Sequence, residues 1–225
     1  MPSLIEVARD ALNISDSTAK PLKFYELYDR YFSAFRGREI ALIELGVHKG
    51  DSLKVWASYF TGCVIGVDRA ERGPDLSSYP HAVYVQADQS DARRLAAICK
   101  EHAPAGLDIV IDDAAHIGRH AAVSFAVLFP LLNAGGLYVV EDWATGYFGD
   151  WPDGALYRSA DELAREAPAG RFPSHDFGMV GFVKSLIDRV AGDHIRPSLN
   201  GLPIQSDTVE FMHVYKTCAI LKKSE

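Results

Sequence analysis

The segment Glu44-Leu-Gly46-Val-His-Lys-Gly50-Asp-Ser52 decides the fold, because it joins a strand-like run to a stretch of helical period. Residues 40–45 are apolar and partly β-branched, as in a buried strand, and residues 52–59 follow the helical pattern. Glycines in such a turn let a ligand approach the main chain at the carboxyl end of a strand. A dinucleotide-binding turn would carry a glycine two residues after Gly46, where this chain has His48. The turn therefore predicts a ligand site and weakens the dinucleotide interpretation without excluding it.

The same alternation of apolar runs and helical segments continues along the chain and predicts a parallel sheet with helices on both faces. The expected strands are residues 40–45, 64–68, 83–86, 107–111 and 137–140, and the expected helices between them are 52–59, 92–102 and 120–132. An N-terminal helical segment, 1–38, is expected to hold helices at 4–12 and 23–35. After the core we expect a lid-like aromatic insertion at 144–178, a helix at 179–190, and an antiparallel hairpin of 208–215 and 217–222.

Composition restricts the class of protein. The 225 residues carry 23 Lys+Arg against 30 Asp+Glu, a formal net charge of −7, which disfavours a nucleic-acid binder. No apolar run is long enough to span a bilayer, and acids in residues 1–17 are unlike a signal peptide, so a cytoplasmic protein is expected. The three cysteines are far apart and predict reduced thiols. We expect one domain over 1–225, and the aromatic stripe of residues 23–35 favours a lid or a homo-oligomer surface.

Acids also follow the second and third expected strands. Asp68 ends the run Gly66-Val-Asp, where a carboxylate can accept two hydrogen bonds from a ribose diol. Asp88 follows the third strand and is placed to contact an adenine amine. Each acid alone could equally be a turn or helix-cap residue.

Together, the pattern E-x-G-x-x-x-G, the acid ending strand two and the acid after strand three resemble class I S-adenosylmethionine-dependent methyltransferases over residues 40–143. The resemblance implies a Rossmann-like, seven-stranded, mostly parallel α/β sheet with a C-terminal antiparallel hairpin. It also implies that Glu44, Gly46 and Gly50 surround the methionine part, that Asp68 binds the ribose and that Asp88 lies near the adenine. Ser52 and Asp112 complete the expected cofactor-binding set.

Acids and a histidine gather after the fourth and fifth expected strands. Strand four continues into Asp112-Asp113-Ala-Ala-His116, and strand five continues into Glu141-Asp142. Four carboxylates at neighbouring strand ends repel one another unless a cation neutralises them. Oxygen ligands of this kind suit Mg²⁺, or Mn²⁺. For any single acid, a helix cap or a solvated strand end is the simpler explanation, but the two clusters together favour a metal.

The pair Asp-Asp-x-x-His and Gly-Gly-Leu-Tyr-Val-Val-Glu-Asp-Trp resembles the metal-dependent sugar O-methyltransferases of the mycinamicin and macrocin type. Mycobacterial methylmannose polysaccharide O-methyltransferases are a further likeness. The resemblance implies Asp113, Glu141 and Asp142 as metal ligands, His116 as general base, and a saccharide or glycosylated metabolite as acceptor. Aromatic residues of the insertion would then offer flat surfaces to sugar rings: Trp143, Tyr147, Phe148, Trp151, Phe172 and Phe177.

Other functions remain compatible with the same sequence. A catechol or other phenol also chelates Mg²⁺, so a phenol O-methyltransferase is the nearest alternative. A Rossmann-type oxidoreductase that uses NAD and a catalytically silent nucleotide-binding subunit are alternatives from different classes.

Overall fold

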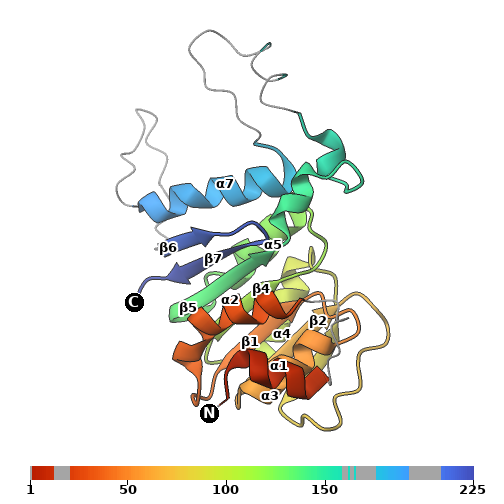
Figure 1. Ribbon diagram of the computed structural model, residues 1–225, viewed down its shortest axis with the longest axis vertical. Helices are drawn as coiled ribbons and strands as arrows, with labels where there is room; N and C mark the ends of the chain where they lie inside the picture. Colours follow the sequence, from red (N-terminus) through yellow and green to blue (C-terminus); the bar gives the residue numbers. More distant parts are fainter. Residues whose placement is uncertain (1, 13–20, 159–161, 163–164, 166–175, 193–208) are drawn as a thin grey trace.

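The computed structural model describes residues 2–12, 21–158, 162, 165, 176–192 and 209–225, which form one seven-stranded sheet with helices on both faces (Figure 1). The strand order is β3-β2-β1-β4-β5-β7-β6. Strands β1 to β5 are parallel, whereas β7 runs antiparallel to both β5 and β6. The strands are β1 Ala41–Leu45, β2 Cys63–Asp68, β3 Ala82–Gln86, β4 Leu107–Asp112, β5 Leu132–Glu141, β6 Val209–Val214 and β7 Cys218–Lys223. This is the predicted fold class, including the terminal hairpin.

The helices also follow the sequence pattern closely. They are α1 Leu4–Leu12, α2 Leu22–Phe32, α3 Asp51–Tyr59, α4 Ala92–His102, α5 Gly118–Leu128 and α7 Gly178–Ala191. Short 3₁₀ turns occupy Ser33–Phe35 (η1), Trp143–Tyr147 (η2) and Gly154–Leu156 (η3). No helix in these described ranges is long and apolar enough to cross a membrane.

The predicted boundaries between α5 and β5, a helix to residue 132 and a strand from residue 137, are wrong. The helix expected to continue to residue 132 ends at Leu128, and β5 begins at Leu132. Phe129 still has helical dihedral angles, but Pro130 has no N–H to continue the helical hydrogen bonds, so the helix ends early. The released segment then pairs with β4, and Leu132 lies opposite Leu107.

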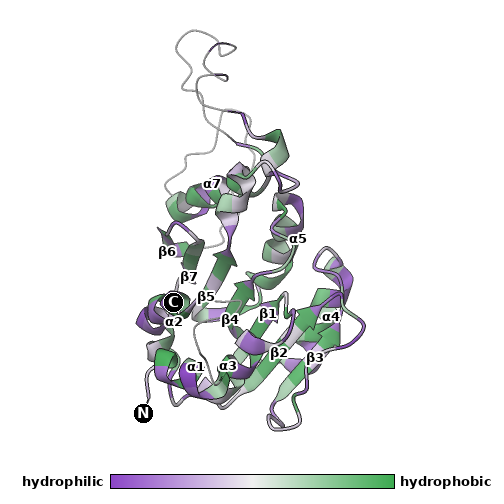
Figure 2. Cartoon of the chain, turned by 45° about the vertical axis from the view of Figure 1, so that its right-hand side comes forward, coloured by the Kyte–Doolittle hydropathy of each residue, from purple (hydrophilic) through white to green (hydrophobic). Residues whose placement is uncertain are grey.

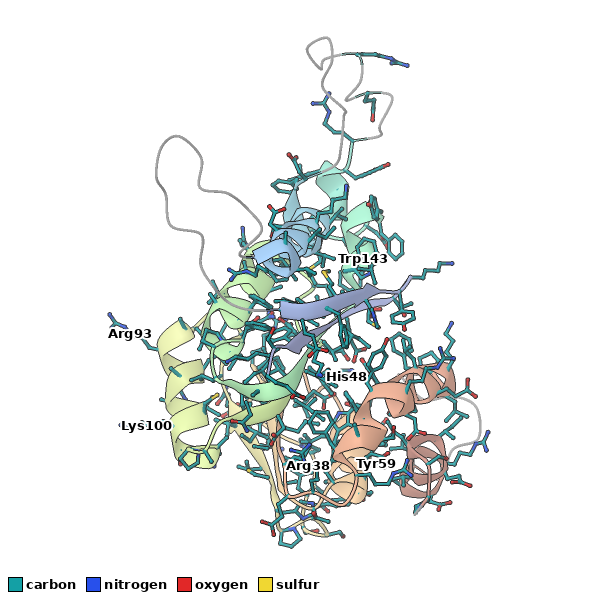
Figure 3. All side chains as sticks on the ribbon, turned by 90° about the vertical axis from the view of Figure 1, so that its left-hand side faces the viewer. Arg38, His48, Tyr59, Arg93, Lys100 and Trp143 are labelled. Carbon is teal, nitrogen blue, oxygen red and sulfur yellow. The ribbon has the colours of Figure 1, made fainter. Side chains whose placement is uncertain are left out.

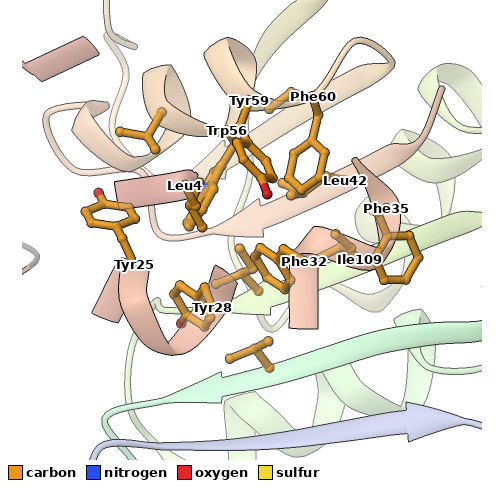
Figure 4. Packing of buried hydrophobic residues seen from close by; sticks show 14 of the residues in the cluster. Leu4, Tyr25, Tyr28, Phe32, Phe35, Leu42, Trp56, Tyr59, Phe60 and Ile109 are labelled. Carbon is orange, nitrogen blue, oxygen red and sulfur yellow. The ribbon is translucent and has the colours of Figure 1, made fainter. Parts of the chain in front are cut away.

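Alternation along the strands divides the buried side chains into two layers. Leu42, Ile109 and Ile111 face α1, α2 and α3, whereas Ile43 and Val110 face α4, α5 and α7. The first layer is aromatic: Tyr25, Tyr28 and Phe32 of α2 pack on Trp56 of α3 (Figure 4). The strands between the layers are largely hydrophobic (Figure 2), while α4 directs Arg93 and Lys100 outward (Figure 3). Both faces of the central strands are therefore covered, as predicted, and the two edge strands, β3 and β6, are only partly buried.

The sheet order changes direction at β1. From β1 the chain proceeds through β2 to β3 on one side, and then places β4 and β5 on the other. In open α/β sheets, ligands bind at the carboxyl ends of the strands beside such a switch point. The β1–α3 turn, the end of β2 and the ends of β4 and β5 all lie at this edge, so the fold brings the predicted site residues to one place.

Candidate active site

The β1–α3 turn is built around glycine. Gly46 has a φ of +88°, and a Cβ there would lie 2.0 Å from the main-chain oxygen of Asp113. The Asp113 N–H donates to the Leu45 carbonyl at 2.9 Å, so the turn and the end of β4 are held in direct contact. Gly50, with a φ of +85°, precedes the first residue of α3. The turn can take this close approach only because Gly46 has no side chain.

Asp68, at the end of β2, organises the neighbouring loop. Its Oδ2 accepts the N–H groups of Val47 at 2.8 Å and His48 at 3.0 Å, and its Oδ1 accepts that of Ala70 at 2.9 Å. Partial burial opposes ionisation, but the main-chain donors outweigh it, and the pKa of Asp68 lies below its usual value. The predicted ribose acid is therefore ionised at neutral pH.

Asp88, after β3, is more exposed and has local partners. Its Oδ1 accepts the Ser90 N–H at 2.8 Å and the Ser90 hydroxyl at 2.6 Å, which lowers its pKa. The next residue, Gln89, is buried and was not predicted as a site residue. Its amide Nε2 donates to Asp112 at 2.5 Å, and its Oε1 accepts the Ala115 N–H at 3.2 Å. Gln89 thus connects the end of β3 to the end of β4.

Two adjoining cavities open at this edge. The first, of about 400 Å³, lies between the ends of β1, β2 and β3, and its lining includes Asp88, Gln89 and Trp151. The second, of about 710 Å³, reaches the ends of β4 and β5 and includes Ser52, His116 and Asp142. They share four lining residues, Gly46, Asp68, Arg69 and Ala114. The pair is large enough for a small-molecule ligand that extends from β3 to β4.

Three predicted residues form a compact acid–histidine cluster in the second cavity. Ligand atoms of Asp113, His116 and Asp142 lie within 4.8 Å of one another. The His116 Nε2 is 3.7 Å from Asp113 Oδ1 and 3.9 Å from Asp142 Oδ2. The side chains of Asp113, His116 and Asp142 are 21%, 11% and 44% exposed. Carboxylate oxygens converging on one point are the donor set that a hard divalent ion requires.

The backbone around this cluster is unusual. Among the described residues, three that are not glycine have positive φ, namely His48 at +47°, His116 at +50° and Asp142 at +48°. All three line the second cavity. Residues with a Cβ rarely adopt this conformation, and such residues concentrate at functional sites. The backbone and the side chains therefore indicate the same site independently.

Glu141 is adjacent to the cluster but lies deeper. It is 2% exposed, and its Oε1 accepts the hydroxyl of Tyr28 at 2.5 Å. Burial and the Glu141 charge raise the pKa of Tyr28 well above its usual value, so the phenol remains a proton donor. Glu141 also lines the second cavity, beside Asp142. It is within the site, and its metal-binding role stays a prediction.

Two adjacent acids at the end of β4, Asp112 and Asp113, point to opposite sides of the sheet. Asp112 is on the α5 side, where Gln89 donates to Oδ1 and the Ser124 hydroxyl donates to Oδ2 at 2.6 Å. Burial raises its pKa to about 6. Asp113 lies one residue beyond the strand and faces the second cavity. The predicted cofactor residues Glu44, Gly50 and Asp112 are not among the lining residues of either cavity, and Glu44 is buried where it accepts the Trp56 Nε1–H at 3.0 Å.

Trp151 is placed directly against His116, with ring centroids 5.3 Å apart and an interplanar angle of 63°. It belongs to the expected insertion 144–178, of which the structure describes 144–158, 162, 165 and 176–178. Phe172 lies outside the described residues. That this segment forms a lid stays a prediction.

The fold and the two-part edge site define the class I methyltransferase architecture. No family model matches the sequence. The rhamnosyl tetracenomycin-C 2'-O-methyltransferase of Streptomyces olivaceus is 36% identical over 206 residues, which cover 87% of this chain and 49% of that protein. The mycinamicin VI 2''-O-methyltransferase of Micromonospora griseorubida is 33% identical over 205 residues, which cover 87% of this chain and 47% of that protein.

The solved structures agree with these relatives. The MycE methyltransferase from the mycinamycin biosynthetic pathway, determined in complex with Mg and SAH, aligns with a TM-score of 0.76 and 30% identity, covering 100% of this chain and 55% of that one. The chain thus spans about half the length of the curated relatives it matches. It has the class I methyltransferase fold, and it is related to the sugar O-methyltransferases of the mycinamicin type, as the sequence pattern predicted.

Proposed function

We propose that this chain catalyses methyl transfer from S-adenosylmethionine to a sugar hydroxyl, with a divalent ion, Mg²⁺ or Mn²⁺, bound at the acid–histidine cluster. The observation that carries the proposal is the convergence of Asp113, His116 and Asp142 beside a cavity continuous with the β1–β3 edge. The acceptor is a saccharide or a glycosylated metabolite, in line with the named activities of the relatives.

The first cavity is the proposed adenosine site. Asp68 presents an ionised carboxylate at its wall, where ribose hydroxyls would donate, and Asp88 lies farther along the same wall, toward the adenine. Gly46 and Ser52 line the second cavity, where the methionine part would extend toward β4. Glu44, Gly50 and Asp112 support this surface from within the fold. The SAH in the MycE structure is consistent with this assignment.

The residues of the cluster suit a metal ion. Asp113 and Asp142 offer oxygen ligands, and Glu141 lies beside them, so two or three carboxylates would balance a divalent charge. When bound, the ion would supply the positive charge that favours ionisation of an acceptor hydroxyl. Asp113 and Asp142 would orient that hydroxyl toward the methyl donor by fixing the position of the ion.

His116 is the proposed general base. Its ring is held beside both carboxylates and against Trp151, which fixes its orientation in the second cavity. Histidine is the residue most often used as a general base, because an imidazole can both take up and release a proton near neutral pH. Because a sulfonium methyl is already activated, alignment and deprotonation of the acceptor are the main requirements of the reaction.

The wider assignments belong to the same proposal. We infer a single methyltransferase domain over 1–225 that acts in the cytoplasm on a small-molecule or oligosaccharide acceptor rather than on nucleic acid, and that assembles as a homo-oligomer. Cys63, Cys99 and Cys218 form no disulfide with one another, which favours a reducing compartment, and burial raises the pKa of Cys99 to about 11.

The test is a transfer assay with methyl-labelled S-adenosylmethionine on the purified full chain. Rhamnosides, other glycosides and catechols are offered as acceptors, with Mg²⁺ or with excess chelator. We expect label on a glycoside, loss of transfer in chelator, and recovery when Mg²⁺ is restored. Transfer to catechols alone would replace the acceptor class, and full activity in chelator would contradict the metal site. Binding of NAD in place of S-adenosylmethionine would overturn the proposal.

A further inference from the structure

A buried carboxylate outside the proposed site joins two helix N-termini. Asp153, which directly precedes η3, is 7% exposed, and its Oδ2 accepts the N–H groups of Gly118 and Met179, both at 2.7 Å. Gly118 is the first residue of α5, and Met179 is the second residue of α7. The N–H groups of a first helical turn have no partner within their helix, and a negative charge is stabilised there. One side chain thus caps both helices.

The junction around Asp153 is closely packed. A Cβ on Gly118 would lie 2.2 Å from the main-chain carbonyl of Gly178, and a Cβ on Gly178 would lie 2.5 Å from the Asp153 carboxyl carbon. Gly178 also has a φ of +58°, which favours glycine. Three chain segments therefore meet at Asp153 without space for a larger residue, so the carboxylate has a defined position.

Asp153 and its hydrogen-bond partner Gly118 each lie close in sequence to one member of the His116–Trp151 contact. His116 is two residues before Gly118, and Trp151 is two residues before Asp153. The hydrogen bond from Gly118 therefore ties the segment carrying the imidazole to the segment carrying the indole. Trp151 lines the first cavity while its ring contacts His116, so a shift at this junction would reach both cavities.

We propose that Asp153 is a positioning residue: by joining the N-termini of α5 and α7, it holds Trp151 against His116 and so fixes the imidazole in the second cavity. This inference rests on the proposed function for its consequence in catalysis, but the positioning itself can be measured without turnover. It differs from a purely stabilising role, which would loosen the whole fold equally.

The experiment compares Asp153→Asn and Asp153→Ala with Asp108→Asn as the matched control. Asp108 also accepts a main-chain N–H, from Ala41 at 2.9 Å, but it lies at the opposite end of β4. Histidine modification by diethylpyrocarbonate is followed residue by residue by mass spectrometry. His81, whose Nε2 lies 2.9 Å from the Ala57 carbonyl oxygen, reports general loosening.

We expect His116 to be modified several-fold faster in Asp153→Ala, with His81 unchanged, and neither rate to change in Asp108→Asn. In the transfer assay, kcat should fall by roughly ten- to a hundredfold, because a displacement of about 1 Å can cost that much. The dissociation constant for S-adenosylhomocysteine should rise by no more than about threefold, because Trp151 is one of several residues that line the first cavity and Asp68 is untouched. Asp153→Asn keeps the shape and one acceptor oxygen, and should recover most of the loss.

If His116 and His81 were modified faster by the same factor, Asp153 would only stabilise the fold, and the proposal would be overturned. A folded Asp153→Ala with wild-type kcat and wild-type His116 reactivity would also overturn it. If the wild type transfers no methyl group, the modification rates still decide the positioning claim, while the proposed function fails separately. If Asp153→Ala does not fold, the modification rates of His116 and His81 are compared between Asp153→Asn and the wild type instead.

Discussion

The two halves of the carboxyl edge use acids in opposite ways. Beside β2 and β3, Asp68 and Asp88 accept neutral N–H and hydroxyl donors, which lower their pKa values. Beside β4 and β5, Asp113 and Asp142 lie close to each other and to His116, on backbone that is left-handed at His116 and Asp142. In the first half, hydrogen bonds from the protein already stabilise the two carboxylates, and the cavity beside them suits an organic ligand. The second half gathers charge that a cation would balance.

The comparison indicates that the two halves of the edge have different functions. Substitutions in the β2–β3 half should act on cofactor affinity, whereas substitutions in the β4–β5 half should act on metal binding and turnover. Effects that cross between the halves would show that the division is wrong.

The largest expected effect is at His116. His116→Ala should lower kcat by about 10²- to 10⁴-fold, the usual contribution of positioned proton transfer, because no base would remain beside the acceptor hydroxyl. Affinities for S-adenosylmethionine and for Mn²⁺ should change little, as calorimetry can establish. His102→Ala, at the end of α4, is the control and should retain activity. A normal rate in His116→Ala would place the base elsewhere.

A smaller but clear effect is expected at Asp68. Hydrogen bonds to a charged group contribute roughly 1.5–3 kcal/mol, so Asp68→Ala should weaken S-adenosylmethionine binding by about tenfold or more. The change also removes the acceptor of the Val47, His48 and Ala70 N–H groups, which should lower the free energy of unfolding. Unchanged affinity by calorimetry would remove Asp68 from the site.

The lowered pKa of Asp68 gives this prediction a pH dependence. A carboxylate whose folded-state pKa is depressed stabilises the protein fully above its unfolded value, about 3.9, and loses that contribution as pH falls through the folded value. The difference in unfolding free energy between the wild type and Asp68→Asn should therefore be constant from pH 7 to about 5 and shrink below about pH 4. A difference that grows in acid would contradict the sign of the shift.

The smallest effect is expected at Asp88. Its carboxylate is largely satisfied by Ser90, and the residue is exposed. Asp88→Asn should weaken S-adenosylmethionine binding by only a few-fold and leave kcat unchanged. A loss as large as that of Asp68→Ala would mean that adenine recognition, rather than the ribose acid, dominates this half.

The strands and the edge could be predicted because alternating runs and strand-end acids are local features of the sequence. The division between Asp112 and Asp113 could not be read so easily, since it depends on where β4 ends. No feature of the sequence pointed to Gln89, because its role depends on the fold bringing the chain after β3 close to the end of β4. Asp153 and Trp151 lie in a segment without periodicity. Asp and His adopt left-handed backbone more often than most residues, but that preference is too weak to locate it at His116 and Asp142.

Metal binding tests the central claim most directly. Mn²⁺ binding to the purified full chain is measured by electron paramagnetic resonance for the wild type, Asp113→Ala, Asp142→Ala and the control Asp91→Ala, which removes the N-cap of α4. The account predicts one bound ion per chain, weakened by at least about tenfold in both cluster variants, or roughly 1.4 kcal/mol, and unchanged in the control. A wild type that binds no Mn²⁺, or cluster variants that bind it equally well, would contradict the account.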